Sequence, residues 1–222
     1  MKKNPLFKAL LTLGVYALFL LIPASQKFFV GLIKGLTPNA FMVNALIYLL
    51  PVLVVLFFYG KEVLAEFSYF KSKFLQKVGQ VFGLFLSIQV LNYLMNLLLA
   101  FLGPANSVNQ EAVSQAAGQA PLYQTTLLFV ILGPLVEEVV FRRILLKEGS
   151  RFLPEWLAMA ISWFAFILIH VHAPIDILTY MPVATVLTVA YLISKKTLAF
   201  SWSVHMLNNA FAVLLPIFLN SL

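Results

Sequence analysis

The sequence predicts an all-α membrane protein, a polytopic transmembrane helix bundle of about seven spans plus one interfacial amphipathic helix. Of its 222 residues, 62% are hydrophobic and only 10% are charged, and the mean hydropathy is +0.95. A soluble domain keeps roughly a quarter of its residues charged, so this chain could not cover itself with polar surface. Because no stretch has the composition of a separate soluble domain, we expect a single transmembrane domain over residues 1–222.

Seven apolar runs each approach the roughly 20 residues that a spanning helix needs. The first begins after two lysines and ends at Pro23-Ala24-Ser25, a pattern that resembles a signal peptide. Because six further spans follow and its orientation suits them, we interpret it as an uncleaved first helix. The predicted spans cover residues 6–24, 38–60, 78–103, 122–146, 156–173, 175–194 and 198–219.

Two segments between the predicted spans have a different character. From Pro104 to Ala120 the chain is polar and carries no Lys or Arg, so we expect a surface loop. From Glu62 to Lys77, apolar residues recur at near-helical spacing among charges, which predicts an amphipathic helix in the membrane interface. These apolar residues are Val63, Leu64, Phe67, Phe70 and Phe74.

The positions of the basic residues predict the orientation of the chain. The net charge is +7, but Lys and Arg lie in short links between apolar runs and form no aromatic-basic pattern, so we expect no nucleic-acid partner. With the N-terminus in the cytoplasm and the C-terminus outside, only Lys27 and Lys34 fall outside, as the positive-inside rule favours. The other 13 are Lys2, Lys3, Lys8, Lys61, Lys71, Lys73, Lys77, Arg142, Arg143, Lys147, Arg151, Lys195 and Lys196.

Ionisable side chains inside the spans indicate the candidate site, because such groups are costly in a membrane. The chain has no cysteine, which excludes a thiol nucleophile and a Cys-ligated metal. Residues 1–120 hold apolar N-terminal spans almost free of ionisable groups, and residues 121–219 form the motif-bearing core. The polar residues of this core are Glu137, Glu138 and Arg142 in the fourth span, His170 and His172 at the end of the fifth, and His205, Asn208 and Asn209 in the seventh.

Chain spacing predicts that these groups meet. The charged stretch before Pro154 is a hairpin turn by composition; Glu137 lies 17 residues before that proline and His170 lies 16 after it. At 1.5 Å per residue both reach roughly 25 Å from the turn. His205 follows Lys196 by nine residues, which places it roughly 13 Å inside the cytoplasmic boundary. We therefore expect Glu137, His170 and His205 to converge within the membrane, nearer the cytoplasm.

Spacing within each helix also suggests separate roles. Glu138 and Arg142 are four residues apart and able to pair, whereas Glu137 points about 100° away and is left free. His205 and Asn209 are also four apart. Pro134 cannot donate a hydrogen bond to the helix, so we expect a kink that admits water beside the carboxylates.

Carboxylate and imidazole groups together can activate water. A neutral imidazole is a good Zn²⁺ ligand, and a carboxylate serves as ligand or general base. Without a metal, Glu137 and His170 can share a water as base and orienter, while His205 and Asn209 stabilise an oxyanion. The residues leave both versions open, and no His-Glu-x-x-His helix is present.

Three motifs on successive apolar helices, which contain Glu137, His170 and His205 in turn, resemble those of the CAAX-protease and bacteriocin-processing membrane proteases, the CPBP or Abi family. The resemblance spans roughly Pro121 to Leu215 and implies an intramembrane metallo-endopeptidase that cleaves a peptide near the cytoplasmic side. In it, Glu137 and His170 activate water, Glu138 and Arg142 support the site, and His205 and Asn209 complete the ligand or oxyanion set. The motifs are Glu137-Glu138-x-x-x-Arg142, Phe166-x-x-x-His170 and His205-x-x-x-Asn209.

The resemblance also carries expectations about cofactor, substrate and location. A divalent metal, with Zn²⁺ the first candidate, would bind Glu137, His170 and His205. The family includes proteases of prenylated proteins and bacterial members tied to bacteriocin maturation or self-immunity. The 35 residues from His170 to His205 are few for a eukaryotic prenyl protease and favour a bacterial member. We therefore expect a multi-pass plasma-membrane protein in contact with lipid, acting on a peptide or protein with a membrane-proximal tail.

Three other interpretations remain open. The polar residues can be interhelical glue, although a buried pair of glutamates is expensive for that purpose alone. A small transporter would use the same groups as a proton relay, but no internal repeat is visible. A non-catalytic bacteriocin-immunity protein would bind a peptide or receptor in the membrane. His172 is interpreted as interfacial and Phe166 as a packing residue.

Overall fold

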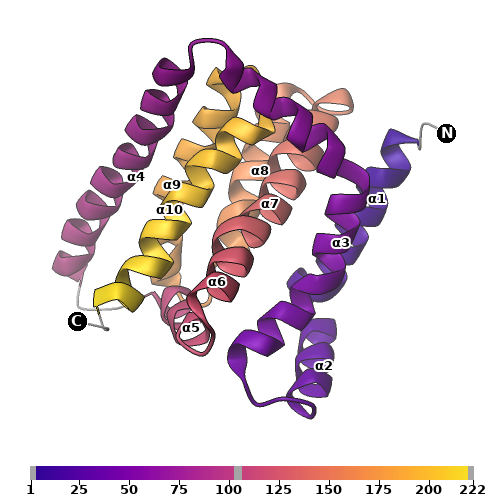
Figure 1. The fold of residues 1–222 in the computed structure, drawn as a ribbon, viewed down its shortest axis with the longest axis vertical. Coiled ribbons are helices and arrows are strands. Elements are labelled where there is room, and N and C mark those ends of the chain that lie inside the picture. Colours follow the sequence, from indigo (N-terminus) through magenta and orange to yellow (C-terminus); the bar gives the residue numbers. More distant parts are fainter. Residues whose placement is uncertain (1–3, 103–106, 220–222) are drawn as a thin grey trace.

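The computed structural model describes residues 4–102 and 107–219, and the regular elements in them are all helices (Figure 1). This confirms the predicted all-α class. Segments of π-helix cover Ala17–Leu21, Thr126–Leu132 and Val139–Glu148, and 3₁₀ segments cover Phe67–Lys71 and Gly149–Arg151. The α-helices are α1 (Pro5–Tyr16), α2 (Pro23–Lys34), α3 (Ala40–Glu66), α4 (Phe74–Leu102), α5 (Val108–Ala117), α6 (Leu122–Thr125), α7 (Gly133–Glu138), α8 (Glu155–Leu168), α9 (Pro174–Ile193) and α10 (Leu198–Leu219).

The expected count of seven spans is supported only in part. Among the described residues, four helices are long and apolar enough to cross a membrane, and the count rises to five if one bent pair is a single span. Helix α8 is apolar but has 14 residues, or roughly 21 Å, which is less than the ~30 Å hydrocarbon core. The four helices are Ala40–Lys71, Phe74–Ala100, Pro174–Ile193 and Leu198–Phe218.

The first expected span, residues 6–24, is not one straight helix. The helix breaks at Ile22, whose backbone is extended with φ −80° and ψ 111°. The segments Pro5–Leu21 and Pro23–Lys34 meet at 68° and form the bent pair. The cause is Pro23, which has no N–H to continue the helix and disfavours helical backbone in the residue before it.

Both segments predicted between spans differ from expectation. Residues 62–77 are not a separate amphipathic helix, because α3 runs on to Glu66 and a 3₁₀ segment follows it. The chain then breaks at Lys73, whose φ is 52°. Part of the expected loop from Pro104 to Ala120 is the helix α5, and Ser107 caps it by accepting the Gln110 N–H at 3.3 Å. Residues 104–106 lie outside the described part of the chain.

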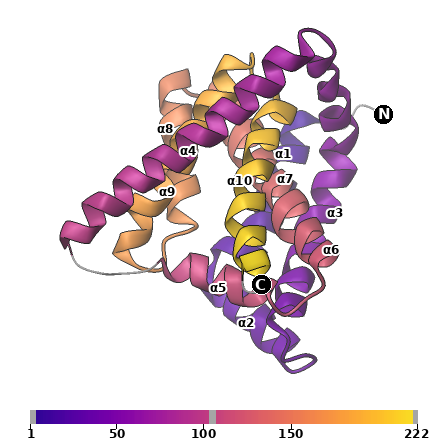
Figure 2. The same cartoon turned by 60° about the vertical axis from the view of Figure 1, so that its left-hand side comes forward.

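The region from α6 to Glu148 lies at the centre of the fold, and α3, α8 and α10 pack against it (Figures 1 and 2). Helix α9 packs against α8 and α10, and α4 lies outside α9 and α10. Within the apolar window of α4 only 11% of the residues are buried, against 50% for α9 and for α10. The rest of the described chain therefore leaves most of the surface of α4 uncovered.

The predicted hairpin before α8 is present. The chain turns through the 3₁₀ segment Gly149–Arg151, and α8 begins at Glu155 directly after Pro154. The two arms are joined in the interior, where the Ser162 hydroxyl donates to the Phe141 carbonyl at 2.6 Å. The hairpin thus places α8 alongside Val139–Glu148, the segment that directly follows the two glutamates (Figure 1).

The turn between α9 and α10 contains two residues with strained backbone, and the first of them, Lys195, allows a stability prediction. Lys195 and Lys196 have φ of 59° and 61°, in the left-handed region that residues with a Cβ avoid. We expect Lys195→Gly to raise the free energy of unfolding by about 0.5 kcal/mol, because strain relief exceeds the entropy that glycine adds to the unfolded chain. Thermal unfolding in detergent, with Lys195→Ala as the matched charge-removing control, measures this; equal midpoints would contradict it.

Candidate active site

Glu137 lies at the meeting point of two histidines. Its Oε2 atom is 3.6 Å from Nε2 of His205 on α10 and 3.9 Å from Nε2 of His170 just beyond α8. The side chains of Glu137, His205 and His170 are largely buried, with 10%, 3% and 14% of their surfaces exposed, respectively. The groups that chain spacing placed at one depth therefore lie together, and their chemical roles stay a prediction.

His170 is held in place although it lies past the end of α8. Its Nδ1 donates to the Phe166 carbonyl at 2.7 Å, because a carbonyl can only accept. One face of the imidazole stacks on Tyr180 of α9, with centroids 4.4 Å apart and planes 15° apart. The Phe166 ring lies 4.8 Å away from it. These contacts fix the ring so that Nε2 faces Glu137.

His205 is oriented by Glu138. The Nδ1 atom of His205 lies 3.2 Å from Oε1 of Glu138, and the Ser201 hydroxyl donates to Oε2 of the same carboxylate at 2.6 Å. A carboxylate that accepts from both places the imidazole proton on Nδ1 and leaves Nε2 with its lone pair. Glu138 thus acts on the tautomer of His205, while Glu137 faces the other ring nitrogen.

Arg142 completes a fully buried ion pair with Glu138. Its Nε lies 3.8 Å from Oε2 of Glu138, and neither side chain is exposed. Its Nη2 reaches the Ala184 carbonyl at 3.5 Å, and its guanidinium lies 4.7 Å from the centroid of the Phe166 ring. The predicted pairing four residues apart is confirmed. The guanidinium of Arg142 stays in the interior, and two of its nitrogens, Nε and Nη1, have no hydrogen-bond partner in the described structure.

The arrangement around Glu137 favours a group that bridges the carboxylate and the two imidazoles. With both Nδ1 atoms donating, the two Nε2 lone pairs and an ionised carboxylate are three acceptors that face one another. Their separations of 3.6 and 3.9 Å exceed hydrogen-bond length, and acceptors alone repel. A water molecule, a shared proton or a cation between them would remove the repulsion. The geometry is therefore suited to holding a water beside a base.

The structure places Asn209 beside the helix that carries the glutamates. Its Nδ2 donates to the Phe129 carbonyl at 3.0 Å. Phe129 lies in a π-helical segment five residues before Pro134, and a π-helix pairs residues five apart. Pro134 has no N–H to give, so Asn209 supplies the donor. Because the segment is π-helical, the carbonyl that Pro134 leaves without a backbone donor is that of Phe129, five residues earlier. An α-helix would instead have left the carbonyl four residues earlier without one.

The predicted Zn²⁺ site requires three protein ligands that surround one point. Glu137, His170 and His205 offer the donor types that Zn²⁺ uses. Across the residues that the structure describes, however, no group of three or more His, Cys, Asp or Glu side chains is arranged to hold a metal ion. In this arrangement the described side chains therefore do not form a metal site.

Several residues have roles that the sequence did not indicate. Ser201 and Tyr180 contact the candidate site directly, and Phe166 does more than pack, since its carbonyl and ring both hold His170. Ser201 has a usable signal, because it precedes His205 by four residues and so shares its helix face. Tyr180 has none. His172 is exposed, and its backbone N–H donates to Asp176 at the start of α9.

Comparison with known proteins agrees with the motifs. Residues 119–211 match a family model described as type II CAAX prenyl endopeptidase Rce1-like, and this range includes all three motifs. No curated protein and no solved structure gave a match to the chain. Residues 119–211 are thus similar to the same CAAX-protease family that the three motifs resemble.

Proposed function

We propose that the protein is an intramembrane endopeptidase in which Glu137 and His170 activate a water molecule. The observation that carries the proposal is the convergence of the Glu137 carboxylate and two imidazole Nε2 atoms in a buried site. The match of residues 119–211 to the Rce1-like family model supports the reaction class, because that family is described as an endopeptidase. The substrate is a peptide with a membrane-proximal tail, reached from the cytoplasmic side.

The proposed reaction assigns a role to each group. Glu137 accepts a proton from the water, and the resulting hydroxide attacks the peptide carbonyl carbon. His170 orients that water through Nε2. Glu137 then returns the proton to the leaving amine as the C–N bond breaks. His205, whose Nδ1 is held by Glu138, takes a proton from solvent on Nε2 before the substrate binds and keeps it through the cycle, and this N–H donates to the oxyanion.

We propose separately that the site binds a divalent metal, which can be tested without measuring peptide cleavage. When bound, Zn²⁺ would supply a more acidic water and polarise the carbonyl, and Glu137, His170 and His205 are the candidate ligands. Metal analysis of the purified protein, with a variant lacking both histidines as the control, tests this independently of activity. Stoichiometric metal in the wild type and none in the control is the expected result for a metalloenzyme.

Peptide cleavage by detergent-purified protein tests the proposed function. A prenylated C-terminal peptide, the same peptide without its lipid, and bacteriocin-leader peptides are the reporters, each with and without a chelator. We expect cleavage of a reporter that has a membrane-proximal tail, and recovery by Zn²⁺ if the chelator inhibits. If the protein cleaves no reporter peptide but protects cells against a bacteriocin, the results would favour the non-catalytic binding protein instead.

A further inference from the structure

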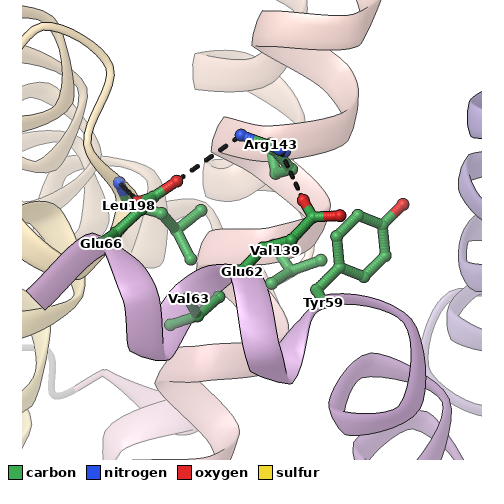
Figure 3. Close-up of a pocket in the computed structure, with 7 residues that line it drawn as sticks. All are labelled: Tyr59, Glu62, Val63, Glu66, Val139, Arg143 and Leu198. Carbon is green, nitrogen blue, oxygen red and sulfur yellow. Dashed lines mark hydrogen bonds and ion pairs between the residues drawn. The ribbon is translucent and has the colours of Figure 1, made fainter.

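Figure 3 shows a cluster of charged side chains around Arg143, none of which belongs to the group proposed to be catalytic. Glu62 and Glu66 come from the last turns of α3, and Arg143 comes from the segment Val139–Glu148. Arg143 pairs with Oε2 of Glu62 at 2.6 Å and with Oε1 of Glu66 at 3.6 Å. On its other oxygen, Glu62 also pairs with Lys8 of α1 at 3.2 Å.

Glu66 makes a second contact that Glu62 lacks. Its Oε2 accepts the backbone N–H groups of Leu198 at 2.5 Å and of Ala199 at 3.3 Å, at the first residues of α10. A helix N-terminus has N–H groups without intrahelical partners and a partial positive charge, so a carboxylate stabilises it. One side chain thus connects the helix of Arg143 to the start of α10.

The cluster does not form a ligand site. The cavity that its residues line is only about 10 Å³, which is the space of roughly one water molecule. The charged groups there already bind one another and the end of α10. Their contribution is therefore to the relative placement of helices.

We propose that Glu66 is a positioning residue for the catalytic centre. Arg143 follows Glu138 by five residues, or roughly 7.5 Å of helix, and His205 follows Leu198 by seven, or roughly 10.5 Å. Glu66 joins these two helices at one level, and Glu138 joins them at another through Ser201 and His205. Two levels of attachment fix both the rotation and the depth of His205 relative to Glu137. This inference rests on the proposed function.

The chain supplies a matched pair of variants. Glu62 and Glu66 are one turn apart on α3 and both bind Arg143, but only Glu66 reaches α10. We expect Glu66→Ala to lower kcat by about 10- to 100-fold with KM within about twofold, because a displacement near 1 Å costs that much when reacting groups must be aligned. Glu62→Ala is expected to keep kcat within about twofold of the wild type, because the contact of Glu66 with α10 remains and His205 is not displaced.

A conservative variant and a distance measurement separate positioning from simple destabilisation. Glu66→Gln keeps an acceptor oxygen for the N–H groups of α10 and is expected to recover most of kcat. Because the natural chain has no cysteine, Lys61→Cys and Lys195→Cys, both at exposed positions, accept a pair of spin labels. We expect the measured distance distribution to broaden or shift in Glu66→Ala and to stay unchanged in Glu62→Ala.

The two readouts distinguish the failure of each proposal. A wild-type protein that cleaves no reporter rejects the proposed function, and the spin-label distances then test the helix placement alone. An unchanged distance distribution in Glu66→Ala overturns the positioning role, and so does an unchanged kcat. Equal losses of kcat in the Glu62→Ala and Glu66→Ala variants overturn it as well, because the contact with α10 would then be irrelevant.

Discussion

Glu137→Gln is expected to lower kcat/KM for peptide cleavage by about 10³-fold or more while the protein still folds. Glutamine keeps the shape of the side chain but cannot accept a proton from water, and general-base catalysis contributes roughly 10²- to 10⁴-fold. The carboxylate faces two imidazole nitrogens at 3.6 and 3.9 Å. The neighbouring carboxylate cannot replace it, because Glu138 is already bound to Ser201 and His205.

The measurement is the initial rate of cleavage in detergent, with far-ultraviolet circular dichroism and gel filtration as tests of folding. Glu111→Gln is the matched control, because it makes the same chemical change at an exposed position of α5. His170→Ala should show a loss of similar order, since it removes the group that orients the water. Cleavage by Glu137→Gln within tenfold of the wild type would exclude Glu137 as the general base.

The sequence predicted the helical class and the hairpin, and it failed where helices bend or change type. Pro154 and the charged turn before it were sufficient to predict that α8 folds back on the preceding helix. Pro23 was also visible in the sequence, but the chain is apolar on both sides of it. Hydropathy therefore gives no sign that the helices before and after Pro23 meet at 68°. The polar residues of α5 looked like a loop by composition, although Ser107 and Gln110 three residues later have the spacing of a helix N-terminal cap.

The candidate site was predictable to the extent that it depends on spacing along single helices. Counting residues placed Glu137 and His170 at the same distance from the turn and led us to expect His205 near them, and the separation of four predicted the pair Glu138–Arg142. What counting cannot supply is rotation between helices. The stacking of Tyr180 on His170 and the contact of Asn209 with the Phe129 carbonyl depend on how α9 and α10 turn against their neighbours.

The largest effect on stability is expected at the pair of Glu138 and Arg142. Both side chains are fully buried, at 3.8 Å from each other, and Arg142 already has two nitrogens without hydrogen bonds. Removing the carboxylate alone leaves an uncompensated buried cation, which costs about 3–5 kcal/mol. We therefore expect Glu138→Ala to unfold at much lower temperature or denaturant concentration than the wild type.

The double variant Glu138→Gln/Arg142→Met separates the charge pair from the catalytic role. Methionine removes the cation and fills a similar space, so the free energy of unfolding should return to within about 1–2 kcal/mol of the wild type. Cleavage should not return, because the amide that replaces the Glu138 carboxylate presents no anionic acceptor to fix the tautomer of His205. Denaturant titration and cleavage rates on the same preparations measure the two effects. A double variant as unstable as Glu138→Ala would show that the uncompensated charge of Arg142 is not the cause of the lost stability.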